Sequence, residues 1–95
     1  MRVPRIQLEF LKSRIVEFAP EAKVYLFGSR VHDSKRGGDI DILILSSTLL
    51  TLEQKIAIKT AFGAEFGEQK IDLVNFTFTD NDPFKKLVLL EAIEL

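Results

Sequence analysis

The chain has 95 residues, of which 46% are hydrophobic and 28% are charged, and its formal net charge is −1. These values predict one globular domain over residues 1–95 with a thin core, and the near-neutral charge argues against a stand-alone nucleic-acid binder. The sequence contains no cysteine and one histidine, which excludes disulfides and metal sites built from cysteine or several histidines. Any metal would be held by carboxylates, as Mg²⁺ and Mn²⁺ are.

The first residues predict a helix rather than a signal peptide or a membrane span. Residues 1–10 lack an apolar core with a cleavage site, and no run approaches about eighteen apolar residues, so we expect a cytoplasmic protein without membrane contact. From Pro4 to Phe18, apolar residues recur at spacings of three and four, which predicts a helix that ends before Pro20. The residues expected to face the core are Leu8, Leu11, Ile15 and Phe18.

Two short strands with a polar loop between them are predicted next. Residues 23–27 are β-branched, aromatic and apolar, which is typical of a strand, and Gly28 ends it. Residues 29–38 are polar and end in a double glycine, so they predict a loop. Residues 40–45 are almost continuously apolar apart from Asp41, which suits a strand that is covered on both faces.

The second half of the chain alternates helix and strand. Thr51 and Gln54 resemble a capping box for a helix that runs to about Phe66. The residues expected to line its buried side are Leu52, Ile56, Phe62 and Phe66. Residues 71–78 predict a third strand, which carries Asp72.

A last helix is predicted at the C-terminal end. Asp82 can cap it, Pro83 suits its first turn, and the apolar pattern continues to about Leu95. Its expected buried residues are Leu87, Leu90 and Ile93, and the surplus residues expected to contact a partner are Val88, Leu89 and Leu95. The order α-β-β-α-β-α predicts an α/β or α+β fold, with helices packed on a small mixed sheet of three to four strands.

Three aspartates in these strands need an explanation. Side chains alternate along a strand, so Asp39 and Asp41 point to the same face, about 6.5–7 Å apart along the chain. Two like charges this close repel each other, and a divalent cation turns the repulsion into attraction. Asp72 would add a third carboxylate if its strand lies beside theirs. Such a cluster suits metal-assisted phosphoryl or nucleotidyl transfer, in which one Mg²⁺ bridges triphosphate oxygens and a second activates the attacking hydroxyl.

A Gly-Ser turn after the first predicted strand would complete such a site. Gly28 lets a phosphate approach the backbone, and Ser29 can donate a hydrogen bond to it. Basic side chains in the same loop are those of Arg30, Lys35 and Arg36. Each feature alone has a simpler interpretation: a turn, the end of a loop, a tolerated strand-start charge at Asp72, a solvated loop residue at His32. Their combination in this order is much more specific.

The segments Phe27-Gly28-Ser29-Arg30 and Gly38-Asp39-Ile40-Asp41-Ile42 resemble the signature of the DNA polymerase β-like nucleotidyltransferase superfamily. The length of the chain is most similar to its minimal nucleotidyltransferase (MNT) branch. The sequence departs from the common pattern at Asp33, where many members have glycine, and at Gly38, where many have serine. Neither departure removes a metal ligand.

The resemblance implies the nucleotidyltransferase fold and a role for each matching residue. Asp39 and Asp41 would bind the catalytic metals, two Mg²⁺ ions. Asp72 would complete the metal site and help to deprotonate the incoming hydroxyl. The residues that would bind the nucleoside triphosphate, with ATP as the donor, are Gly28, Ser29 and Arg30.

The resemblance also implies a partner. MNT proteins are commonly paired with a HEPN-domain protein that is often an RNase toxin, so we expect an antitoxin that transfers AMP from ATP to a tyrosine of such a toxin. With 95 residues there is little room for a domain that grips a nucleic acid or a sugar, which fits a protein acceptor. Two alternatives stay open: a non-catalytic antitoxin that neutralises the toxin by binding it, and a less favoured enzyme that modifies small molecules of the aminoglycoside type. A homodimer and a hetero-oligomer both remain open.

Overall fold

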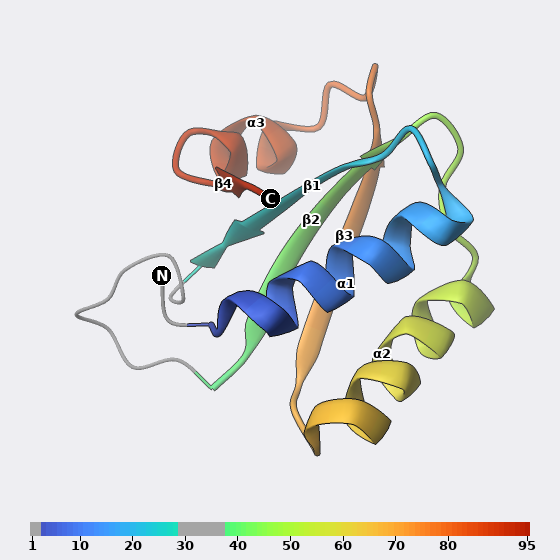
Figure 1. The fold of residues 1–95 in the computed structure, drawn as a ribbon. Coiled ribbons are helices and arrows are strands. Elements are labelled where there is room, and N and C mark those ends of the chain that lie inside the picture. Colours follow the sequence, from blue (N-terminus) through green and yellow to red (C-terminus); the bar gives the residue numbers. More distant parts are fainter. Residues whose placement is uncertain (1–2, 29–37) are drawn as a thin grey trace.

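The elements of the fold follow the predicted order. A computed structural model describes residues 3–28 and 38–95 (Figure 1). Its elements are α1 (Arg5–Phe18), β1 (Lys23–Phe27), β2 (Ile40–Ser46), α2 (Leu52–Phe66), β3 (Ile71–Thr77), α3 (Pro83–Leu89) and β4 (Ile93–Glu94). The order α-β-β-α-β-α is therefore confirmed, and the described part of the chain adds one short strand after it. Within those ranges no helix has the length and apolar character needed to cross a bilayer.

The strands form one mixed sheet in the order β3-β2-β1-β4. Strand β1 is antiparallel to both of its neighbours, β2 and β4, whereas β2 and β3 are parallel. Parallel neighbours need a crossover connection, and α2 provides it. Both α1 and α2 lie across the same face of the sheet (Figure 1).

The main core lies between that face and the two helices. The buried strand residues that form it are Val24, Leu26, Ile40, Ile42, Ile44, Ile71 and Leu73, and the helices add Leu8, Leu11, Ile15, Ile58 and Phe62. On the opposite face, Phe84 of α3 packs against Phe27 and Phe76, with ring centroids 6.2 and 6.4 Å apart. Leu43 and Leu45 point to this second face and are buried, so β2 is covered on both faces as predicted.

The sequence pattern predicts the ends of α2 well and its buried face only in part. The capping box forms: the Gln54 backbone N–H donates to Thr51 Oγ1 at 3.1 Å, and the Thr51 N–H donates to Gln54 Oε1 at 2.9 Å. Phe62 is buried and Phe66 partly buried, as expected. Leu52 and Ile56, which were also expected to be buried, are exposed, and Ile58 is buried instead. Apolar residues surround much of this helix, so spacing alone does not select the face; the position of α1 does. Phe18 at the end of α1 is likewise exposed rather than buried.

The predicted C-terminal helix is too long, and its buried face is wrong. Helix α3 ends at Leu89, and the chain turns back to form β4, which pairs with β1. This pairing gives partners to backbone groups at the edge of β1, which outweighs the local preference for helix. Leu87 and Leu90 are 67% and 79% exposed. The residues expected to be surplus, Val88, Leu89 and Leu95, are instead partly buried, as is Ile93.

A buried lysine joins α3 to the end of β3. Lys85 is buried, and its ammonium donates hydrogen bonds at 2.8–3.0 Å to the backbone carbonyls of Thr77, Phe78 and Asp80. Replacing it by methionine keeps most of the apolar stem but leaves these carbonyls without their donor. We expect Lys85→Met to lower the free energy of unfolding by about 2–3 kcal/mol, measured by urea denaturation. Lys86, the exposed neighbour of Lys85, supplies the control. An equal loss of free energy of unfolding in Lys86→Met would contradict the role of the Lys85 hydrogen bonds.

Candidate active site

Asp41 and Asp72 lie side by side at one end of the sheet. They occupy paired positions on the parallel strands β2 and β3, and Phe27 is the partner of Asp41 on β1. Paired residues on adjacent strands are about 4.7–4.9 Å apart and point to the same face. Ile40 and Ile71, one residue before each aspartate, are buried under the helices. Alternation therefore turns both carboxylates to the opposite face, where Asp41 is half-buried and Asp72 exposed.

Asp39 lies in the bend just before β2 and is held by the segment that precedes β3. The backbone N–H of Ile40 donates to the carbonyl of Lys70 at 3.0 Å. Gln69 Nε2 donates to the carbonyls of Gly38 and Lys70, at 2.5 and 3.0 Å. The ammonium of Lys70 lies 3.6 Å from Asp39 Oδ2. These contacts tie Asp39 to the start of the strand that carries Asp72.

Two of the three aspartates are paired in the sheet, and the third contacts a lysine instead. In residues 3–28 and 38–95, no group of three histidine, cysteine or acidic side chains is close enough to hold one metal ion. The register brings Asp41 and Asp72 together, while the carboxylate of Asp39 is directed to Lys70. Carboxylates are nevertheless the donors that a hard cation such as Mg²⁺ prefers. Gly28, which has no side chain, leaves room beside the carboxylate of Asp41. This donor set fits Mg²⁺ or Mn²⁺.

Gly28 provides that room. Its φ of +79° lies in the left-handed region, which favours glycine. A Cβ at this position would collide with Asp41 Oδ2 and lie 3.1 Å from its Cγ. Gly28 is therefore in direct contact with a predicted metal ligand. Ser29 and Arg30, predicted to bind the nucleotide, lie outside the described residues, as do His32, Asp33, Lys35 and Arg36.

Tyr25 lies on the same face of β1 as Phe27. It is the one tyrosine of the chain, and burial raises its pKa, with a further increase from the charge of Glu94, its partner on β4. Its hydroxyl therefore stays protonated at physiological pH and adds no negative charge to the face that carries the aspartates.

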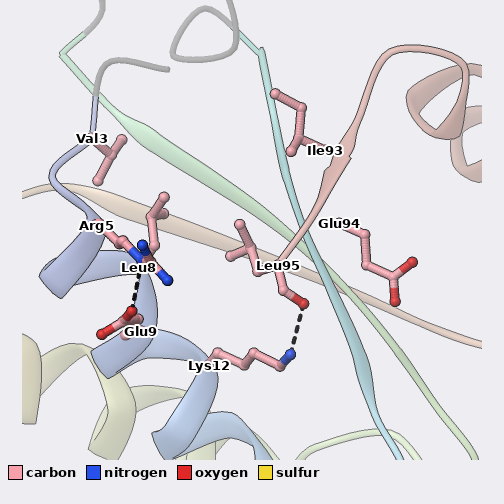
Figure 2. Close-up of a pocket in the computed structure, with 8 residues that line it drawn as sticks. All are labelled: Val3, Arg5, Leu8, Glu9, Lys12, Ile93, Glu94 and Leu95. Atoms are coloured by element: carbon pink, nitrogen blue, oxygen red, sulfur yellow. Dashed lines mark hydrogen bonds and ion pairs between the residues drawn. The ribbon is translucent and has the colours of Figure 1, made fainter.

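A pocket elsewhere on the molecule is separate from the aspartates. It has a volume of about 560 Å³ and lies between α1 and the C-terminal segment, with Leu8, Lys12, Ile93 and Leu95 in its wall (Figure 2). Lys12 Nζ donates to the carbonyl of Leu95 at 2.7 Å across it. None of the predicted site residues that the structure describes lines this pocket, so the chemistry is assigned from the paired aspartates and not from this pocket.

Sequence patterns did not identify Gln69 and Lys70 as site residues. The one signal available was their position, immediately before the strand that carries Asp72. Their contacts with Gly38 and Asp39 cross from one parallel strand to the next, and a contact of that kind has no periodicity along the chain.

Comparisons with known proteins show the family of the chain and its fold. The family model described as "Polymerase beta, Nucleotidyltransferase" matches residues 11–95. A curated relative, "Probable protein adenylyltransferase MntA" of Haemophilus influenzae, is 28% identical over 83 residues, which cover 86% of this chain and 72% of the relative.

Two solved structures share the fold. One is the crystal structure of a toxin–antitoxin complex with AMP-PNP, with a TM-score of 0.69 at 18% identity over 90% of this chain and 69% of the matched chain. The other is a tri-AMPylated HEPN toxin of Shewanella oneidensis in complex with its MNT antitoxin, with a TM-score of 0.60 at 20% identity over 93% and 70%. Because the family model covers residues 11–95, which is most of the sequence, the chain belongs to the polymerase β-type nucleotidyltransferase family.

Proposed function

We propose that this chain is a Mg²⁺-dependent adenylyltransferase that transfers AMP from ATP to a tyrosine hydroxyl of a HEPN-type toxin, and so acts as its antitoxin. The observation that carries the proposal is the pairing of Asp41 with Asp72 beside Gly28. Family membership supports the reaction class. The adenylyltransferase relative and the AMPylated toxin complex support AMP and a toxin as donor group and acceptor. We assign the reaction to the cytoplasm, where ATP is abundant.

The proposed reaction gives each aspartate a task. Asp39, Asp41 and Asp72 would hold Mg²⁺, which supplies charge neutralisation for the triphosphate and lowers the pKa of the attacking hydroxyl. Gly28 and Ser29 would bind the triphosphate, and Arg30 would add a positive charge beside it. Asp72 takes the proton from the acceptor hydroxyl. The hydroxyl oxygen forms a bond to the α-phosphorus while the bond from that phosphorus to the bridging oxygen breaks, and pyrophosphate leaves.

The test is the intact mass of the partner. After incubation of a HEPN-type toxin with this chain and Mg²⁺-ATP, we expect the toxin to gain the mass of one or more AMP units. The matched control replaces ATP by its α,β-methylene analogue, which cannot release pyrophosphate and should leave the mass unchanged. A toxin that is bound by the folded chain and gains no mass with any nucleotide would overturn the proposal.

A second candidate function is neutralisation by binding alone. The ion pair between Lys70 and Asp39, which leaves Asp39 outside the Asp41–Asp72 pair, is the observation that favours it. The double variant Asp39→Asn, Asp41→Asn separates the two functions when RNase activity of the toxin is measured. Full neutralisation by this variant would favour binding alone, whereas loss of neutralisation with retained complex formation supports catalysis.

A further inference from the structure

The loop between α2 and β3 places a cation at the predicted metal site. Lys70 Nζ lies 3.6 Å from Asp39 Oδ2, and Lys70 is two residues before Asp72 in the chain. Three carboxylates are thus associated with this end of the sheet, and Lys70 supplies a positive charge at one of them. Such a charge reduces the repulsion among the aspartates.

The backbone of Lys70 is held by hydrogen bonds, whereas its side chain is exposed to solvent. Its carbonyl accepts hydrogen bonds from the Ile40 N–H and from Gln69 Nε2. By contrast, the side chains of Lys70 and Asp39 are 78% and 44% exposed. An ammonium on a flexible four-carbon stem can leave a carboxylate at little cost when a stronger cation arrives. The position is therefore suited to a counter-ion that can be displaced.

We propose that Lys70 is an internal counter-ion that competes with the catalytic metal for Asp39. This inference rests on the proposed function and assigns a regulatory role within the same site. In the metal-free protein, the ammonium neutralises Asp39 and holds the start of β2 against the segment before β3. The metal must displace it, so Lys70 raises the cation concentration at which the site fills. The residue positions a metal ligand and takes no part in the bond-forming step.

Mn²⁺ binding to the metal-free chain tests this role. Binding is measured as the loss of the electron paramagnetic resonance signal of free Mn²⁺. We expect Lys70→Gln to bind Mn²⁺ about two- to fivefold more tightly than the wild type, the range that an exposed ion pair allows. Lys70→Arg keeps the charge and should stay within about twofold of the wild type. The control is Lys59→Gln, the same change at an exposed position of α2. Helix α2 packs on the other face of the sheet, so this variant should bind Mn²⁺ as the wild type does.

Thermal stability gives a readout that does not depend on transfer activity. Without metal, Lys70→Gln should unfold at a lower temperature than Lys59→Gln, and saturating Mn²⁺ should remove that difference. If the wild type binds Mn²⁺ and Lys70→Gln binds it equally or more weakly, the inference is overturned and the proposed function is not. If neither protein binds Mn²⁺, both are overturned.

Discussion

Replacing Asp41 with asparagine is expected to reduce AMP transfer by at least about a hundredfold and to leave the fold intact. Asparagine has the same shape but no charge, so it is a poor ligand for a hard cation, and loss of even an outer-shell partner of a metal can cost about 10–100-fold. Asp41 lies directly opposite Asp72 in the sheet, so the substitution also removes a repulsion between like charges. We therefore expect the free energy of unfolding in the absence of metal to stay within about 1 kcal/mol of the wild-type value.

Transfer rate and urea denaturation must be measured together to interpret this variant. Glu65→Gln is the control, because it makes the same carboxylate-to-amide change at an exposed position of α2. Full activity in Asp41→Asn would contradict the assigned metal ligand. Loss of activity that is accompanied by a marked loss of stability would show instead that Asp41 has a structural role.

Replacing Gly28 with alanine should reduce AMP transfer about a hundredfold while costing only about 1 kcal/mol of stability. The left-handed φ of +79° accounts for the stability cost. The added methyl group collides with Asp41 Oδ2, the outer end of a side chain that can rotate away. We therefore expect the protein to tolerate the methyl group but the proposed metal ligand to be displaced, and a misplacement of about 1 Å is enough to lower a rate about a hundredfold.

Gly67→Ala is a matched control for this variant. Gly67 has a φ of +93°, so alanine meets the same kind of backbone strain, but no atom lies within 4 Å of its added Cβ. We expect Gly67→Ala to lose a similar amount of stability and to retain its transfer rate. Equal activity in the two variants would contradict a role for Gly28 in making space for Asp41.

The strands could be predicted from sequence better than the packing of the helices. The range predicted for the first strand, residues 23–27, is that of β1, because its β-branched and aromatic residues are bounded by clear turn signals. The buried face of α2 was predicted correctly at Phe62 but incorrectly at Leu52, since apolar residues such as Leu52 and Ile58 lie on different sides of one helix. The C-terminal residues favoured helix locally, and only the nearby edge of β1 explains why they form β4 instead.

The candidate site could be predicted only where its residues are part of a local sequence pattern. Asp39 and Asp41 are separated by one residue in the sequence, and Asp72 stands out as a carboxylate in a later apolar strand. That Asp41 and Asp72 are paired in register depends on the parallel arrangement of β2 and β3, which no local pattern specifies. Lys70 illustrates the limit most clearly: its contact with Asp39 spans the loop before β2 and the loop before β3.

The fate of each ATP phosphate tests most directly the claim that the chain catalyses nucleotidyl transfer. A HEPN-type toxin is incubated with the chain, Mg²⁺ and ATP that carries radioactive phosphorus either at the α or at the γ position. We predict that the α label becomes attached to the toxin and that the γ label is released as pyrophosphate. Attachment of the γ label would mean phosphoryl transfer, and attachment of neither label to a bound, folded toxin would mean no transfer; either result would contradict the claim.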